Sequence, residues 1–226
     1  PLRFKTLGVI TLVVILFSGM SLYQIISFYT RNAFELAAAY NRSLLEHTYS
    51  AIKYPMEVGD SETIDRQFED IKQSMQGIEV YVTDFRQEIT YASEQDRRRT
   101  SLNLHLRQPD AQQALGEAIK SGLSPSATFT ETNAGDSFLI AIKPVLNEPT
   151  CTHCHGTSHK VLGAMVVKQS VTGIFAALST ARIRLLLIYA LEILGIIVLL
   201  HLLLSRLVTR RIRLLGSSPN HRSTKF

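Results

Sequence analysis

Cysteine is scarce in this chain, and the motifs of the common enzyme classes are missing from it. Only two cysteines occur among 226 residues, so neither is left over for a second role. The sequence contains no nucleophile–base pairing, no phosphate-binding loop and no hydrolase-type metal spacing. Catalytic sites of those classes require such patterns. We therefore expect the protein not to be an enzyme.

Charged side chains are scarce in two long stretches. Residues 7–29 form a run of 23 without a charged side chain, and residues 185–204 form a run of 20 that includes Glu192 and His201. About 20 apolar residues cross a hydrocarbon core, whereas the apolar core of a signal peptide has only about 7–15. Both runs are therefore predicted to be transmembrane helices, the first an uncleaved anchor. For Glu192 we favour a polar contact between helices.

Acidic residues are nearly absent outside the stretch between these spans. Residues 29–181 contain 14 Lys and Arg against 18 Asp and Glu, whereas the rest of the chain has ten basic residues and one acidic residue. Basic flanks mark the cytoplasmic side of a span, which predicts both termini in the cytoplasm and the stretch between the spans outside. The high isoelectric point then reflects flanks that face anionic lipid. A nucleic-acid partner is not supported.

Both cysteines belong to the run Cys151-Thr152-His153-Cys154-His155. C-x-x-C-H is the attachment motif of a c-type haem, in which the sulfurs bond to the porphyrin and the histidine ligates the iron. The motif predicts one haem c, attached through Cys151 and Cys154, with His155 as the proximal ligand. Such haems are attached on the outer face of the membrane, where the charge distribution puts this motif. A disulfide, a redox-active cysteine pair and a zinc site completed by nearby histidines are the alternatives.

The stretch between the spans has an α+β pattern. Apolar residues recur with helical spacing over residues 31–57, from residue 61 towards Gly77, and after Pro109. A further helix over residues 171–182 is expected to run into the second span. Alternating apolar residues predict five strands, at 78–84, 89–92, 127–132, 137–145 and 161–169. This order predicts a PAS-like, five-stranded antiparallel sheet with flanking helices, inserted between two transmembrane helices.

Two stretches resemble a known family, residues 54–60 and residues 147–163, which include the C-x-x-C-H motif. They are similar to the periplasmic c-type haem-containing PAS-like sensor domains of bacterial chemoreceptors and sensor histidine kinases. The resemblance covers about residues 30–182. It implies a haem in a loop of the sheet, environmental sensing in the periplasm and a homodimer. An inner-membrane location and a cytoplasmic signalling partner are also expected. In the receptors a HAMP-type relay follows the second span, and we expect residues 205–226 to be a cytoplasmic tail that begins one. The sequence, which starts at Pro1, is expected to be a fragment or a processed form.

Four residues compete for the iron face opposite His155. Met56 is favoured, because it stands where the resembling family has a distal ligand, and a thioether there raises the reduction potential. Met165 is more simply a core residue of a strand, His105 lies in an unpatterned segment, and His159 follows the motif closely. The three arginines at residues 97–99 suit haem propionates. A run of like charges is more often a solvated face, which is the interpretation we favour here.

These features predict a membrane-anchored haem sensor of redox state or of small gas ligands. The expected parts are a first span with its cytoplasmic end (1–29), the haem domain (30–182), the second span (183–204) and the tail (205–226). The signal is expected to pass through the second span. The alternative function is a membrane-anchored monohaem c-type cytochrome that exchanges electrons with a periplasmic redox partner.

Overall fold

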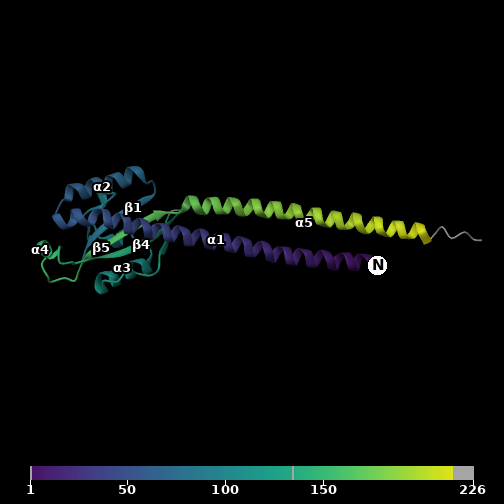
Figure 1. Ribbon diagram of the computed structural model, residues 1–226, viewed down its shortest axis with the longest axis horizontal. Coiled ribbons are helices and arrows are strands. Elements are labelled where there is room, and N and C mark those ends of the chain that lie inside the picture. The colour runs from purple at the N-terminus through teal and green to yellow at the C-terminus, as the bar shows by residue number, and fades with distance from the viewer. Residues whose placement is uncertain (1, 134, 216–226) are drawn as a thin grey trace, which may run out of the picture. The chain divides into compact units, whose positions relative to one another are not determined.

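The computed structural model describes residues 2–133 and 135–215 (Figure 1). The chain divides into two units, one formed by Arg31–Ala177 and the other by the residues up to Thr30 and from Leu178 onwards. The elements are, in chain order, α1 (Leu2–Val58), α2 (Ser61–Ser74), β1 (Ile78–Asp84), β2 (Ile89–Ala92), η1 (Gln95–Arg97), η2 (Leu102–Leu104), α3 (Pro109–Ser121), β3 (Phe129–Asn133), β4 (Asp136–Leu146), α4 (Thr152–His155), β5 (Val161–Ser170) and α5 (Thr172–Leu215).

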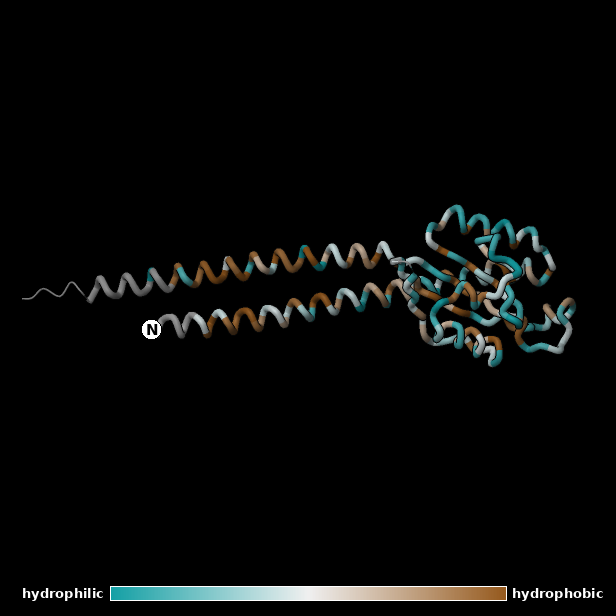
Figure 2. The backbone as a smooth tube through the Cα atoms, turned by 180° about the vertical axis from the view of Figure 1, so that it is seen from behind, coloured by the Kyte–Doolittle hydropathy of each residue, from teal (hydrophilic) through white to brown (hydrophobic). Residues whose placement is uncertain are grey.

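Helices α1 and α5 contain the two apolar runs (Figure 2). The most apolar 18-residue stretch has a mean hydropathy of 2.2 in α1 and 2.6 in α5, and none of either stretch is buried. Length and composition therefore suit both helices to cross a membrane. The prediction of helices that run directly out of the spans is confirmed, because α1 continues from the first span to Val58 and α5 starts at Thr172. The expected relay lies partly beyond Leu215, outside the described residues.

The strands of the sensor unit form one antiparallel sheet in the order β2-β1-β5-β4-β3. The predicted class, α+β with a five-stranded antiparallel sheet and flanking helices, is confirmed. Strands β1 and β2 have the predicted bounds, and the ends of the other three differ by one or two residues. β5 lies at the centre, between β1 and β4, so the last strand before the second span pairs with both halves of the domain.

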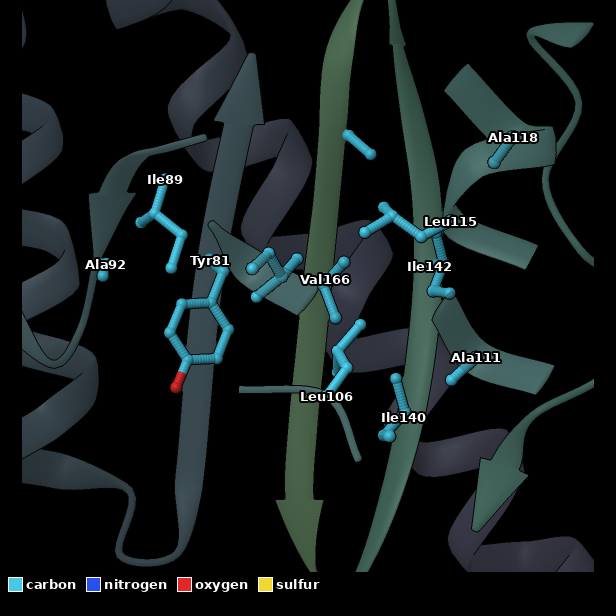
Figure 3. Close-up of a cluster of buried hydrophobic side chains, with 12 residues drawn as sticks. Tyr81, Ile89, Ala92, Leu106, Ala111, Leu115, Ala118, Ile140, Ile142 and Val166 are labelled. Atoms are coloured by element: carbon cyan, nitrogen blue, oxygen red, sulfur yellow. The ribbon is translucent and has the colours of Figure 1, made fainter. Parts of the chain in front are cut away.

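The sheet is covered on both faces, since successive strand residues point to opposite sides. Val80 and Val82 of β1 pack with residues of α1 and α2, whereas Tyr81 between them packs with α3 on the other face. Figure 3 shows the α3-side cluster, in which Leu115 and Ala118 of the helix lie over Ile142 and Val166 of the central strands. The two faces thus form separate cores.

Two segments that were expected to lack regular structure contain short helical turns. The segment around residues 97–107 contains η1 and η2 and buries Leu102 and Leu106 almost completely. The three leucines of this segment, Leu102, Leu104 and Leu106, are two residues apart, a spacing that does not indicate helical turns. The haem motif was expected in a loop, but residues Thr152–His155 form the one-turn helix α4. There the Cys151 carbonyl accepts hydrogen bonds from two backbone N–H groups of that turn, those of Cys154 and His155.

Candidate haem site

The C-x-x-C-H motif lies in the connection between β4 and β5, which is closed by its own hydrogen bonds. The Asn147 side-chain amide donates to the carbonyls of Gly156 and His159, at 2.8 Å in each case. Gly156 ends α4 with a φ of 68°, a left-handed conformation that glycine adopts without a steric penalty. Cys151 is half-buried and Cys154 is exposed, and the two are not joined by a disulfide. The connection therefore holds the two thiols in a preformed turn.

The end of α1 supplies the other side of the site. Tyr49, Lys53 and Met56 recur at positions i, i+4 and i+7, so they share one helix face. The helix passes through Pro55, whose carbonyl accepts a hydrogen bond from the Asp60 N–H at 2.9 Å, and it ends at Val58. Gly59, with a φ of 71°, then turns the chain into α2. This ending leaves Met56 half-buried on the face that α1 shares with the site.

A cavity of about 980 Å³ lies between the end of α1, the ends of β1 and β2, and the motif turn. The predicted site residues that line it are Met56, Cys151, Cys154, His155 and His159. His159 also stacks on the Phe85 ring, with the ring centroids 4.3 Å apart. The fold thus collects a thioether, two thiols and two imidazoles from segments about 100 residues apart in sequence.

Two of the alternative iron ligands lie away from this cavity. Met165 is fully buried in β5 and packs in the core between the sheet and α1 and α2. His105 lies towards the α3 side, where its Nε2 is 2.9 Å from Thr100 Oγ1 and its ring stacks on Tyr81, centroid to centroid at 6.3 Å. Burial lowers the pKa of His105 below its ordinary value. Neither side chain lines the wall that carries the cysteines.

A charged pair joins the motif connection to α1. Lys53 Nζ donates to both carboxylate oxygens of Glu148, at 2.9 and 2.8 Å, and this hydrogen bonding raises the pKa of the Lys53 ammonium. Burial raises the pKa of Tyr49 beside it, and the Glu148 carboxylate adds to the effect. A second pair, Lys143 Nζ to Glu46 Oε2 at 2.6 Å, joins β4 to the same helix. Sequence reasoning missed both pairs, because partners more than 90 residues apart leave no local pattern.

The three consecutive arginines have different surroundings, so the expectation of one solvated face is wrong for two of them. Arg97 Nη1 lies 2.8 Å from Glu79 Oε2 and also donates to the Tyr81 hydroxyl. Arg98 Nη1 lies 3.1 Å from Asp65 Oδ1. Strand β1 and helix α2 supply these carboxylates, which only the tertiary fold brings near the arginines. Arg98 and Arg99 line the cavity.

The chemistry of this donor set fits a covalently attached haem. Two thiols and the adjacent imidazole suit attachment and proximal ligation, and the Met56 thioether suits the opposite iron face. Among residues 2–133 and 135–215, no three His, Cys, Asp or Glu side chains are grouped as a metal site, the arrangement that the zinc alternative needs. The cavity lining therefore includes the residue types that would hold a haem c.

Comparison with known protein families matches residues 49–172 to the sensor of the methyl-accepting chemotaxis sensory transducers, class 40H. The matched stretch starts on the α1 face that lines the cavity, contains the whole sheet and ends at the start of α5. It covers more than half of the chain. Sensors of this kind are receptor domains without enzymatic activity, as the sequence predicted. The chain therefore belongs to the class 40H sensor family of methyl-accepting chemotaxis transducers, with a PAS-like periplasmic sensor domain between two apolar helices.

Proposed function

We propose that this chemoreceptor sensor binds one haem c and responds to its redox state or to a small gas ligand. Cys151 and Cys154 would form the thioether bonds, His155 would ligate the iron from α4, and Met56 would ligate it from α1. The observation that carries the proposal is the shared cavity, which Met56 lines together with the motif although about 100 residues of sequence separate them. A haem bound here supplies an iron whose preference for a sixth ligand depends on oxidation state and on competing gases.

The proposed ligands belong to two different elements. His155 lies in the motif connection, whereas Met56 lies at the end of α1. Release of the Met56 thioether would therefore change how strongly the motif connection and α1 are held together. A signal requires two states of the domain, with Met56 bound to the iron and released from it, that bind the stimulus with different affinity.

Both elements have a covalent path to a candidate span. The motif connection leads through β5 into α5, and α1 runs without a break from Met56 to the first apolar run. The sequence predicted only the path through the second span. We propose that release of the Met56 ligand affects both spans. The Lys53–Glu148 pair couples α1 to the motif connection, where the two paths begin.

The remaining expectations belong to the same proposal. The protein would lie in the inner membrane with both termini in the cytoplasm, act as a homodimer and pass its signal to a cytoplasmic partner. Most of the basic side chains that set this orientation, from Arg3 to Arg213, lie outside the residues whose side chains are described. The family match favours this receptor role over a cytochrome that only carries electrons.

The test is expression of the chain in a host that attaches c-type haem. The mass should show one covalent haem, the reduced-minus-oxidised spectrum should be that of a c-type cytochrome, and Cys151→Ala with Cys154→Ala should abolish both. Carbon monoxide added to the reduced protein should change the spectrum if a gas displaces Met56. An unchanged spectrum would restrict the stimulus to redox state. Absence of covalent haem from the wild-type chain would refute the proposal.

A further inference from the structure

Two guanidinium groups line the cavity, and they differ in what they already bind. Arg98 is paired with Asp65 at 3.1 Å, and its guanidinium carbon lies 5.1 Å from the centroid of the Tyr91 ring. Arg99 is exposed, and its side chain has no ion pair among the described residues. A cavity lined by a guanidinium without an ion pair is suited to a carboxylate ligand, since the planar guanidinium can donate to both carboxylate oxygens.

The backbone holds Arg99 along the free edge of β2. Its N–H donates to the Ile89 carbonyl at 2.9 Å, the Ile89 N–H donates to the Thr100 carbonyl at 2.9 Å, and Ser101 forms an antiparallel bridge with Glu88. The segment therefore lies beside β2 at the edge of the sheet, joined to it by these hydrogen bonds and one isolated bridge. Arg97, two residues earlier, is anchored to Glu79 on β1.

Strand order separates these arginines from the cysteines. The motif connection ends at β5, and β1 and β2 lie between β5 and the Arg99 segment. Three strand spacings of about 4.8 Å put β5, where the motif connection ends, and the Arg99 segment roughly 14 Å apart, a separation of the order of a porphyrin's width. The cavity extends across this distance, because residues of both sides line it.

The two edges of haem c differ in the same way as the two sides of the cavity. Its thioether bonds form at the vinyl-bearing edge of the porphyrin, and its two propionates project from the opposite edge. We infer that Arg99, with Arg98 beside it, binds the haem propionates. This inference rests on the proposed haem. It assigns a carboxylate-binding role to the far side of the cavity, where the sequence favoured a solvated face for the arginine run.

The conformation of Arg99 agrees with this role. Its φ is 63°, in the left-handed region where a residue with a Cβ is strained and glycine is not. Such strain is found preferentially at functional positions. A positive charge at the propionates would also disfavour the oxidised, more positive iron, so Arg99 would raise the reduction potential.

The experiment measures the midpoint potential of the haem-loaded full chain in detergent. Arg99→Gln should lower the potential, whereas Arg99→Lys, which keeps the charge but not the fork, should lower it less. Arg107→Gln is the matched control, because Arg107 is exposed and does not line the cavity. Arg99→Gly should also lower the potential and is compatible with the left-handed backbone if Arg99→Gln accumulates poorly.

A second measurement separates ligand binding from folding. In the haem-free background of Cys151→Ser with Cys154→Ser, Arg99→Gln should leave the urea midpoint unchanged. Equal potentials for wild type, Arg99→Gln and Arg99→Gly would overturn the inference while leaving the haem itself in place. A wild-type chain without covalent haem would instead refute the proposed function.

Discussion

Lys53 of α1 contacts both carboxylate oxygens of Glu148, at 2.9 and 2.8 Å, across 95 residues of sequence. Three residues after Glu148 comes Cys151, and three residues after Lys53 comes Met56. The pair therefore stands immediately beside both proposed iron-facing segments. It is the one ion pair among the described residues that joins α1 to the motif connection, and α1 continues from there to the first apolar run.

Replacing Glu148 with Gln should loosen this connection without unfolding the domain. Pairs that are partly exposed to water contribute little to global stability, so the urea midpoint should stay close to that of wild type. Backbone amides of residues 147–156 should exchange hydrogen severalfold faster, measured by mass spectrometry. Exchanging the charges, with Lys53→Glu and Glu148→Lys together, should restore slow exchange. Unchanged exchange in Glu148→Gln would show that the pair does not hold the connection.

Met56 and Met165 provide a matched pair for the proposed distal ligand. Met56→Leu should change the visible spectrum of the reduced haem protein, because leucine has no sulfur to offer the iron. Met165→Leu should leave the spectrum unchanged and cost less than about 1.5 kcal/mol in free energy of unfolding, as expected for a volume-conserving core change. A spectral change in Met165→Leu and none in Met56→Leu would make Met165 the ligand. No spectral change in either variant would exclude both sulfurs.

The Lys168–Glu131 pair joins β5 to β3 inside the sensor domain. Their side chains are only 6% and 2% exposed, with Nζ and Oε1 2.5 Å apart. Lys168→Met leaves a buried carboxylate without its partner and should cost about 3–5 kcal/mol in free energy of unfolding. Removing both charges, with Lys168→Met and Glu131→Leu, should recover most of that loss. Urea denaturation of the two variants gives the comparison, and equal stabilities would contradict it.

Gly163 stands at the start of β5 where β1 approaches closely. A Cβ at this position would overlap the Thr83 carbonyl on the neighbouring strand. Gly163→Ala should therefore separate β1 from β5 and prevent folding or lower the free energy of unfolding by more than about 3 kcal/mol. Gly116→Ala in α3 is the control, because only the end of the Gln87 side chain is near, at 3.6 Å. It should stabilise the protein by about 0.5–1 kcal/mol.

His105 should make the domain sensitive to mild acid. Because burial lowers its pKa, the folded protein keeps it neutral where the unfolded chain already takes up a proton. Its contribution to stability is therefore complete above the ordinary pKa of about 6.5 and is lost as the pH falls below it. His105→Gln should reduce the difference between urea midpoints at pH 7.5 and pH 5. His47→Gln, at an exposed position of α1, is the control variant.

Strands with alternating apolar residues were predictable because their pattern is local. Both β1 and β2 have the predicted bounds. The short turns η1, η2 and α4 were not predictable, since three or four residues span only about one helical turn and show no repeat. The partners of Arg97 and Arg98 were also hidden, because their carboxylates belong to β1 and α2.

The sequence by itself determined the features that depend on near neighbours along the chain. These are the two apolar runs, the α+β order of elements and the C-x-x-C-H motif, whose spacing alone carries the haem prediction. Only the tertiary structure decided which distant side chains share the cavity. It brought Met56 and Arg99 to the walls around the cysteines and left Met165 and His105 elsewhere. The reason is physical: the face towards which a side chain points depends on strand pairing and helix packing between segments far apart in sequence.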